Sequence, residues 1–582
     1  MTEIIVGIDL GTTNSEVAIV RDGRVEVLEV APGVRILPSV VGVGDDGALL
    51  IGQAARNQYV LHPERSVRSI KRRMGEFTAV HMAGKDYSPQ EISAMILRRL
   101  REIAEAHTGE TVTKAVITVP AYFSDAQRQA TREAGEIAGL EVMRIINEPT
   151  AAALAYESCH SGARKVLVYD LGGGTFDVSV VNLESAVVEV LASHGNNHLG
   201  GDDFDLQLVT FAVEHLQREN GIDVRDNAVA MARLQRAAEA AKIALSDQPY
   251  AILSEEYLLE KDGVPVHLSV EVSRDEYEEM IAPFVAETIE AVHVALSGAG
   301  LTVSEINEIL LVGGATRTPL VQRRLEQDLG LQPRAEVDPD LCVAMGAAIQ
   351  AAVIAGGQAP TVLVDVTPYT FGTSAIGPLN GEIYPYCFVP LIRKNTPIPV
   401  SRSEGFFTVY DGQTKVDVNV YQGEDPDALN NIEIGRFTIE GLRDAPAGNP
   451  LITTFALDVN GILQVTSREK ESGLVHSITI DNAIGRFAGD KLTAARDRID
   501  GMFGDREEAG AAEAVGGRRL RVEATALIEK AERLMTSTGA EDSEDLVNGI
   551  EAVKDCLAGS RSEAELKTAI DALADLLYYL DA

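Results

Sequence analysis

The stretch Val168-Tyr-Asp-Leu-Gly-Gly-Gly-Thr-Phe-Asp-Val-Ser-Val180 decides the fold of this chain. Apolar residues flank three consecutive glycines, a pattern that predicts a β-hairpin whose turn lies against a large group. Backbone N–H groups in such a turn can surround a phosphate, and the flanking carboxylates can hold a hydrated Mg²⁺. The residues expected to do so are Asp170, Gly172, Gly173, Gly174, Thr175 and Asp177.

A second copy of this hairpin occurs near the N-terminus. Gly7-Ile-Asp-Leu-Gly-Thr-Thr-Asn-Ser15 repeats the Asp-Leu-Gly core. Glycines in one strand more often mark a bulge or bend, but two matching strand–turn–strand contexts are not expected by chance. The repeat therefore predicts two related lobes facing one nucleotide. It adds Asp9, Gly11, Thr12 and Thr13 to the candidate phosphate and metal contacts.

The composition limits the classes of function. A length of 582 residues suggests about three or four domains. A net charge of −37 opposes binding to nucleic acid. We expect no membrane insertion, because no segment has 18 uncharged apolar residues, and the N-terminus shows no secretory signal. The four cysteines show no metal spacing. They suit reduced thiols in a cytoplasmic protein.

The first lobe contains two further candidate residues. Strands are expected at 4–8, 16–20 and 25–30. The basic patch Arg68–Gly75 is either a solvated helix end or a segment that places Lys71 near phosphate or the attacking water. Glu148 lies where a strand gives way to an Ala-rich helix, the usual place for ligand groups in open α/β sheets. A surface glutamate is the alternative.

The second lobe shows three nucleotide-side patterns. Gly200-Gly-Asp-Asp-Phe-Asp205 opens a helix, and a helix over 234–245 brings three polar residues onto neighbouring turns. Ile309–Pro319 predicts a strand, a glycine turn and a helix, with Arg317 able to stack on a purine. Asp338-Pro-Asp340 precedes an Ala-rich helix over 341–355.

These motifs resemble those of the DnaK-type (70-kDa heat-shock) chaperone family. The matching stretches are Ile8–Ser15, Val119-Pro-Ala-Tyr-Phe-Ser-Asp-Ala-Gln-Arg128, Ile146-Asn-Glu-Pro-Thr-Ala-Ala152 and Asp170–Asp177. The resemblance implies an actin-like, two-lobed α/β ATPase domain, then a β-sandwich peptide-binding domain and an α-helical lid. It implies ATP or ADP as ligand with Mg²⁺, and K⁺ is a further candidate ion. The expected partners are unfolded client polypeptides, a J-domain co-chaperone and a nucleotide-exchange factor.

Phosphoryl-transfer chemistry and the resemblance give the same roles in the ATPase site. Asp9 and Asp170 would orient the Mg²⁺ and its waters, with Asp177 supporting the ion shell. Lys71 and Glu148 would place the attacking water, and Thr175 would hold a γ-phosphate oxygen. By resemblance, the other nucleotide contacts are Gly200, Gly201, Glu239, Lys242, Ser246, Gly313, Gly314, Ala315, Arg317 and Asp340. The family usually has serine at the position of Ala315.

The expected domains are 1–357 (ATPase), 358–367 (linker), 368–482 (β-sandwich) and 483–582 (lid). The apolar run 361–365 is either the first strand of the β-domain or, as in the family, a linker that docks on the ATPase domain when ATP is bound. The residues expected to couple the domains are Pro120, Arg128, Leu363, Val364 and Asp365.

The segment 366–482 has an all-β pattern. Apolar and polar residues alternate over 415–420, and Asp411-Gly412 and Asn460-Gly461 predict hairpin turns. By resemblance, the peptide-binding positions are Thr373, Phe406, Val409, Val416 and Val418. Ordinary core is the alternative for these five. The loop 377–387 is longer than usual beside the expected pocket.

The last hundred residues predict acidic helices. A capping box at Ser562 and Glu565 precedes an apolar stripe made of Leu566, Ile570, Leu573, Leu577 and Leu580. A short first lobe and the lack of an acidic tail suggest a specialised bacterial-type paralogue.

An ATP-driven chaperone is the leading hypothesis. The alternatives are a kinase with the actin-like fold, a nucleotide-gated filament protein, or a chaperone that binds without useful turnover. The expected β-domain and lid disfavour the first two.

Overall fold

The computed structural model describes residues 4–158, 162–184, 187–261, 264–334, 337–357, 362–479, 487 and 489–507, with scattered helical residues between 524 and 573. The chain divides into two compact units, residues 1–499 and 500–582.

The first lobe is built on a mixed sheet with the strand order β11-β10-β1-β2-β3, and a short β4 also pairs with β2. β1 is antiparallel to β2 and parallel to β10. The bounds are β1 Ile5–Leu10, β2 Asn14–Arg21, β3 Arg24–Val27, β4 Leu37–Pro38, β10 Lys114–Val119 and β11 Glu141–Asn147. β3 ends at Val27, earlier than the strand predicted over 25–30.

The second lobe repeats this arrangement as β18-β17-β12-β13-β14. β12 is antiparallel to β13 and parallel to β17, as β1 is to β2 and β10. The bounds are β12 Arg164–Leu171, β13 Phe176–Glu184, β14 Val187–Asn196, β17 Glu308–Val312 and β18 Pro333–Arg334. The repeated topology agrees with the prediction of two related lobes made from the two hairpins.

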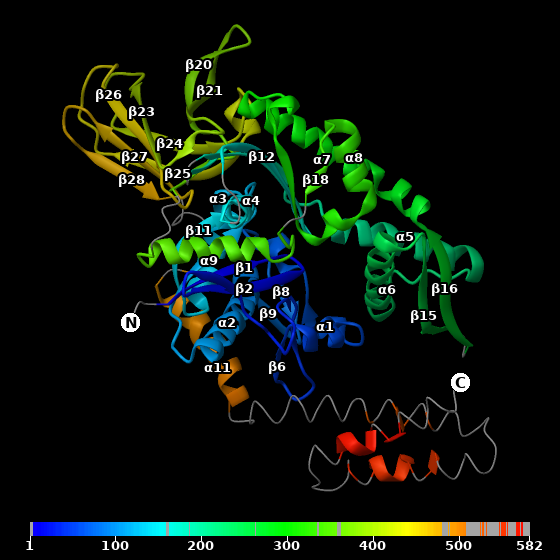
Figure 1. Cartoon of the computed structure of the whole chain (residues 1–582). Coiled ribbons are helices and arrows are strands. Elements are labelled where there is room, and N and C mark those ends of the chain that lie inside the picture. The colour runs from blue at the N-terminus through cyan, green and yellow to red at the C-terminus, as the bar shows by residue number, and fades with distance from the viewer. Residues whose placement is uncertain are drawn as a thin grey trace. The chain divides into compact units, whose positions relative to one another are not determined.

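Two Ala-rich helices, α4 (Glu148–Glu157) and α9 (Cys342–Ile354), pack between these sheets (Figure 1). Small side chains allow an unusually close approach. A Cβ on Gly346 would lie 1.8 Å from the carbonyl oxygen of Ala151, and one on Gly7 would lie 2.1 Å from the backbone nitrogen of Ala348. Larger residues here would push the lobes apart.

Further helices and small strands complete the lobes. In the first lobe these are α1 Gln53–Tyr59, η1 Pro63–Arg65, η2 Ile70–Arg73, α2 Pro89–Thr108, α3 Asp125–Ile137, β5 Val41–Val43, β6 Leu49–Ile51, β7 Ser66–Val67, β8 Val80–Met82 and β9 Lys85–Tyr87. In the second they are α5 Gly201–Asn220, α6 Ala228–Asp247, β15 Tyr250–Lys261, β16 Val264–Ser273, α7 Arg274–Ala299, η3 Val303–Glu305, η4 Gly314–Arg317 and α8 Pro319–Leu329. The predicted caps of α3, Ser124 and Gln127, form a capping box.

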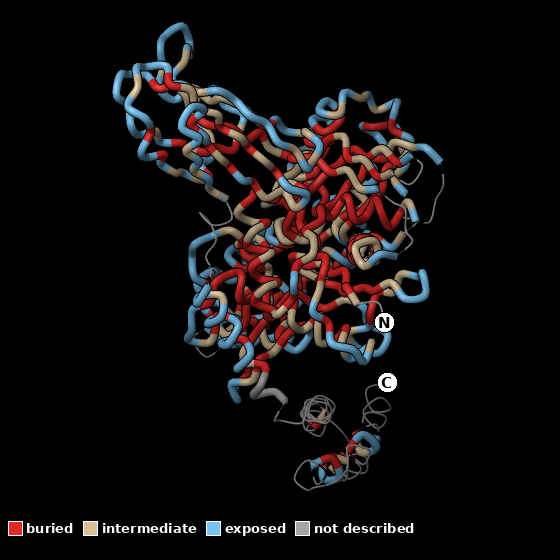
Figure 2. The backbone as a smooth tube through the Cα atoms, turned by 90° about the vertical axis from the view of Figure 1, so that its left-hand side faces the viewer, coloured by how far each residue is buried: buried red, intermediate tan, exposed pale blue. Residues whose placement is uncertain are grey.

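Among the described residues, α7 is the only helix long and apolar enough to cross a membrane by length and composition. Its buried side chains, such as Ile281, Val285 and Val292, belong to the core of the second lobe. We interpret α7 as a core helix. Figure 2 shows that the interiors of both lobes are almost continuously buried.

The linker run forms β19 (Val362–Val366), which joins both domains. It pairs in parallel with β14 of the second lobe and antiparallel with β22 (Pro397–Ile398). The run is therefore a strand of the second lobe's sheet as well as the start of the β-domain.

Two four-stranded antiparallel sheets follow, with the orders β21-β20-β24-β25 and β23-β26-β27-β28. Their bounds are β20 Phe371–Leu379, β21 Glu382–Ile392, β24 Lys415–Gln422, β25 Ile432–Glu440, β23 Val400–Phe407, β26 Pro450–Leu457, β27 Leu463–Glu469 and β28 Val475–Thr479, with η5 at Ala428–Asn430. Both sheets contribute to one buried cluster, which includes Val420 and Phe455.

One of the two predicted hairpins is wrong. Asn460-Gly461 does join two paired strands, β26 and β27. Asp411-Gly412 lies between β23 and β24, but these strands belong to different sheets. The two residues do form a turn, but the chain then crosses to the other sheet, where β24 pairs with β20 and β25 while β23 pairs with β26.

The C-terminal residues are described in part. The helix α11 (Asp490–Glu507) leads into the second unit. There, Leu566, Ile570 and Leu573 are buried together with Ile528, Ile550 and other apolar residues. Three residues of the predicted apolar stripe thus lie in a core. Ser562, Glu565, Leu577 and Leu580 lie outside the described residues.

Candidate nucleotide-binding site and interdomain contacts

The turns of the two Asp-Leu-Gly hairpins face each other. A Cβ on Gly173 would lie 1.9 Å from Oγ1 of Thr13, and one on Gly174 would lie 2.6 Å from Cγ2 of Thr12. Oγ1 of Thr13 is buried and has no hydrogen-bond partner. Glycine is therefore required at these positions by the closeness of the opposite turn. The turn at 172–174 and the turn with Thr12 and Thr13 therefore lie directly against each other.

A third glycine turn lies against the second hairpin. The backbone N–H of Gly201 donates to the carbonyl of Gly172 at 2.9 Å, and that of Asp202 donates to Gly173 at 2.7 Å. A Cβ on Gly200 would lie 2.6 Å from the backbone of Gly173. The N-terminus of α5 thus holds the glycine turn at 172–174 in place, and the N–H groups of Gly173 and Gly174 are suited to phosphate.

Lys71 and Glu148 form a buried ion pair at the base of the cleft. Burial raises the pKa of Glu148 to about 8, with Asp9 adding to the rise and Lys71 opposing it. Burial alone would lower the pKa of Lys71, but Glu148 and Asp9 outweigh it and raise that pKa. The two groups predicted to place the attacking water are therefore side by side, and neither is on the surface.

Three aspartates surround this pair. Asp170 and Asp177 are cross-strand neighbours in the β12–β13 hairpin. Asp9 accepts a hydrogen bond from Thr118 Oγ1 at 2.7 Å. Burial raises the pKa of Asp177 to about 6 and raises the pKa values of Asp9 and Asp170. The positive charge of Lys71 does not balance the negative charges of so many neighbouring carboxylates.

A hydrated divalent cation fits this arrangement. All the candidate ligands offer hard oxygen atoms, which Mg²⁺ prefers. Within the described part of the chain, no three Asp, Glu, His or Cys side chains are close enough to hold a metal ion directly. An ion here would be held by Asp9, Asp170 and Asp177 largely through water. Thr175 is buried in the turn beside them.

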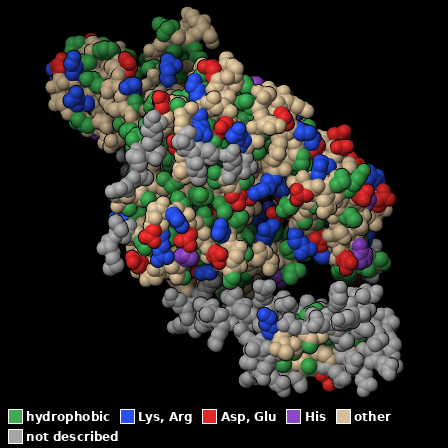
Figure 3. Space-filling view, viewed as in Figure 1, with side chains coloured by type: hydrophobic (Ala, Val, Ile, Leu, Met, Phe, Trp, Pro, Cys, Tyr) green, Lys and Arg blue, Asp and Glu red, His purple; other side chains and the backbone are tan. Residues whose placement is uncertain are grey.

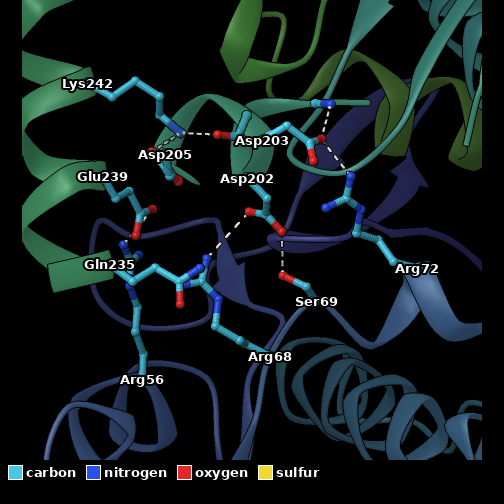
Figure 4. Close-up of polar contacts among 12 residues, drawn as sticks. Arg56, Arg68, Ser69, Arg72, Asp202, Asp203, Asp205, Gln235, Glu239 and Lys242 are labelled. Carbon is cyan, nitrogen blue, oxygen red and sulfur yellow. Dashed lines mark hydrogen bonds and ion pairs between the residues drawn. The ribbon is translucent and has the colours of Figure 1, made fainter. Parts of the chain in front are cut away.

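The predicted adenosine contacts lie on the second lobe. Lys242 pairs with Asp205 at 2.9 Å, and Glu239 pairs with Arg56 of the first lobe at 2.8 Å (Figure 4). They do not pair with each other, because each has a closer partner outside α6. Ser246 Oγ donates only to its own helix, to the carbonyl of Lys242.

The β17–α8 turn forms the other side. Gly313 has φ +81°, and a Cβ there would lie 2.4 Å from the carbonyl oxygen of Leu171. Arg317 pairs with Asp340 at 2.7 Å, so its guanidinium is held beside Gly314 and Ala315. The side chain is about half exposed and is available to a planar base.

Sequence reasoning missed two buried acids. Glu16 is 2% exposed and stands opposite Asp9 in the β1–β2 pair; burial and Asp9 raise its pKa well above the usual value. Glu16 is a charged residue at the start of an otherwise apolar predicted strand, and this pattern could have indicated a buried acid. Asp205, 1% exposed, anchors Lys242. It lies within the stretch Gly200–Asp205, in which only the two glycines were predicted to contact the nucleotide.

Asp365 of the linker strand is buried against the first lobe. Its Oδ2 accepts hydrogen bonds from Asn147 Nδ2 at 2.9 Å and Thr150 Oγ1 at 3.1 Å. Arg128 donates to Asn147 Oδ1 at 2.7 Å. Asn147 directly precedes Glu148, so the linker contact and the Lys71–Glu148 pair are adjacent along the chain.

The other predicted coupling residues surround this contact. Leu363 is half-buried against a core cluster that both lobes share, and Val364 pairs with Glu189 of β14. Pro120 ends β10 and begins the segment that carries Tyr122. The Tyr122 N–H donates to Asp177 at 2.9 Å, while its carbonyl accepts from Tyr369 of the β-domain at 2.6 Å.

The five predicted peptide-binding residues differ in burial. Val418 is buried in a core cluster, and Val416 packs at its edge. Thr373 is buried and donates to the carbonyl of Asn419. Phe406 lies opposite Leu451, a member of that cluster, whereas Val409 is 59% exposed in the β23–β24 connection. In this arrangement of the two sheets, Val418 and Thr373 have the environment of ordinary core.

Comparisons with known proteins agree with this geometry. The family model described as "Hsp70 protein" matches residues 5–81 and 76–580. The chain is 49% identical over 486 residues to the chaperone protein DnaK of Thermotoga neapolitana, covering 82% of this chain and 80% of that protein. The DnaK proteins of Thermotoga petrophila and Thermotoga maritima match to the same extent. The chain therefore belongs to the Hsp70 family of molecular chaperones.

Proposed function

We propose that this chain hydrolyses ATP in the cleft between its lobes and uses the hydrolysis cycle to switch its affinity for exposed apolar segments of unfolded proteins. The observation that carries the proposal is the buried contact of Asp365 with Asn147, one residue from Glu148. It connects the segment leading to the β-domain with the residues expected to act on ATP.

The residues of the cleft divide the work of hydrolysis. The N–H groups of Gly173 and Gly174 bind the phosphates in a turn that Gly200 and Gly201 hold in place, and Thr13 and Thr175 add hydroxyls. Glu148 in its ionised form, paired with Lys71, can accept a proton from the attacking water that Lys71 holds beside it. Mg²⁺, when bound, would supply the positive charge that stabilises the leaving phosphates. Positioning and charge are what phosphoryl transfer requires.

Coupling follows from the shared contacts. Asp365 and Tyr369 contact the first lobe next to Glu148 and Asp177 respectively. A change in the phosphates held by the cleft would shift these neighbours and change the docking of β19. By linkage, peptide binding in the β-domain would alter nucleotide affinity by the same factor.

Further parts of the proposal rest on family membership. We assign 1–357 as an actin-like ATPase domain, 358–367 as the linker, 368–482 as a β-sandwich that binds peptides, and 483–582 as its lid. ATP or ADP with Mg²⁺ is the ligand, and a J-domain protein and a nucleotide-exchange factor are the partners. The cytoplasm is the proposed location.

An ATPase assay with and without an unfolded apolar peptide tests the function. We expect slow basal hydrolysis that the peptide stimulates, and release of a labelled peptide on addition of ATP. The label must be extrinsic, because the chain has no tryptophan. Phosphoryl transfer to a small-molecule acceptor would indicate a kinase. Peptide binding without hydrolysis would indicate a chaperone that only binds.

A further inference from the structure

The basic patch 68–73 holds more than the proposed catalytic Lys71. Figure 3 shows basic side chains gathered in the middle of this face, between the lobes, in a protein of net charge −37. Arg68, Ser69 and Arg72 all point from the first lobe towards the start of α5 in the second (Figure 4). The solvated helix end considered from the sequence does not describe them.

The contacts across the cleft are specific. Ser69 Oγ donates to Asp202 Oδ2 at 2.6 Å, and Arg68 pairs with Asp202 Oδ1 at 3.4 Å. Arg72 pairs with Asp203 at 2.6 Å. The side chains of Arg68 and Asp202 are only 17% and 10% exposed. Partial burial reduces screening by solvent, so this pair is stronger than an ordinary surface ion pair.

Asp202 and Asp203 stand in the first turn of α5, directly after the glycine turn at 200–201. The backbone N–H of Asp202 donates to Gly173, and the side chain of Asp203 accepts from the N–H of Gly200. The aspartates that receive the first-lobe contacts are therefore fixed to the phosphate surface. Separation of the lobes must break these contacts.

The backbone of Ser69 supports a dedicated role. Its φ of +51° places it in the left-handed region. Such a conformation is unfavourable for a non-glycine residue, and it persists where the surrounding contacts require it. Here it precedes η2 and accompanies the hydrogen bond to Asp202.

We propose that Arg68 and Ser69 with Asp202 form a latch that holds the lobes closed over the nucleotide. These are positioning residues that set the rate of nucleotide dissociation. A nucleotide between the lobes cannot leave until the lobes separate, and the latch joins them beside the phosphate turn. The proposal rests on the proposed nucleotide site.

The test measures dissociation of fluorescent ADP from the full-length protein after a chase with unlabelled ADP. Arg68→Ala and Ser69→Ala should each speed dissociation by about threefold to fivefold, the effect of a partly buried polar contact. Arg68→Lys should restore most of the wild-type rate. Single-turnover hydrolysis of bound ATP should change less than twofold, because the latch does not contact the reacting atoms.

Arg73→Ala is the matched control. Arg73 ends the short helix η2, which begins directly after Ser69, but it pairs with Glu76 and Thr78 of its own lobe. The Arg73→Ala substitution removes the same positive charge but no contact between the lobes. ADP dissociation should therefore stay at the wild-type rate.

A double-mutant cycle gives the sharper result. Asp202→Asn removes the charge that faces Arg68, so the Arg68→Ala/Asp202→Asn variant should dissociate no faster than the faster single variant. If the effects of Arg68→Ala and Asp202→Asn on ADP dissociation add, the latch proposal is wrong. The same follows if Arg68→Ala and Arg73→Ala release ADP at equal rates. Neither result would affect the proposed nucleotide site. Failure of the wild type to retain ADP would overturn the proposed nucleotide site and the latch together.

Discussion

Lys71 and Glu148 show how one buried pair can serve catalysis. Glu148 is buried with Asp9, Asp170 and Asp177 nearby. Lys71 is the cation that balances part of this negative charge. Lys71 also lies 5.8 Å from the centre of the Phe123 ring, which covers it with apolar surface. A charge in such surroundings acts more strongly on a phosphate than it would in water.

Lys71→Ala should abolish hydrolysis and leave ATP binding largely intact. Glu148 would lose its cation, its pKa would rise further, and a protonated Glu148 could not accept a proton from water. Because Lys71 is needed most as the γ-phosphate detaches, the loss should fall on kcat, by at least about a hundredfold. Single-turnover kinetics measure this, with Arg73→Ala as control. A single-turnover rate near wild type would remove Lys71 from the mechanism.

At the scale of elements, β19 connects the two domains. The strand extends the sheet of the second lobe through β14, and its next partner is β22 of the β-domain. A flexible tether would favour glycine and serine, whereas this strand is mostly apolar and buries Asp365. Leu363 is half-buried against the core cluster that both lobes share, while Val362 is 56% exposed.

Leu363→Asp should uncouple the domains. A carboxylate in place of Leu363 would be desolvated in the docked strand, at a cost at least equal to a coupling free energy of about 1–3 kcal/mol. The variant should still bind ATP and peptide, but peptide should not stimulate hydrolysis and ATP should not release peptide. Both losses should appear together, because coupling of binding is reciprocal.

Val362→Asp provides the matched control for this experiment. It adds the same charge to the same strand at an exposed position, so coupling should persist. ATP-driven release of peptide from Leu363→Asp would show that docking of β19 does not carry the coupling. Equal defects in both variants would show that charge, and not burial, is responsible.

At the scale of the whole molecule, residues of both lobes and of the β-domain line an open cavity of about 600 Å³. Its lining includes His194, Tyr122, Lys394 and Glu424. The His194 imidazole stands edge-on to the Tyr122 ring at 5.1 Å. Burial lowers the pKa of His194, and Lys394 lowers it further.

Docking of the domains should weaken as the pH falls below about 6.5, the ordinary pKa of histidine. A lowered pKa in the docked state means that protonation favours the undocked state, so the contribution of His194 is present above that pH and lost below it. Burial raises the pKa of Asp365, which acts in the opposite direction. Comparison of wild type with His194→Asn isolates the histidine.

Small-angle scattering with ATP bound at pH 7.5 and 5.5 measures this effect. The wild type should expand more at pH 5.5 than His194→Asn does. His81→Asn, on the exposed β8–β9 hairpin, removes an imidazole remote from the interface and should behave as wild type. An identical expansion in all three proteins would exclude His194 from the pH response.

The sequence alone determined the features that depend on local pattern. The two Asp-Leu-Gly hairpins predicted two related lobes because glycine is needed where backbones approach closely, and that need is visible in the residues. The position of Glu148 at a strand-to-helix junction and the capping box at Ser124 were likewise readable, since turns and caps require particular residue types.

Only the tertiary structure decided the partners of the side chains. It paired Lys71 with Glu148 across 77 positions and turned Arg68 and Ser69 towards Asp202. It also sent β23 and β24 into different sheets after a turn that looked like a hairpin. Local sequence limits the conformation of a few residues, whereas these contacts depend on how distant elements pack. Burial by residues far along the chain is also what raises the pKa values in the cleft.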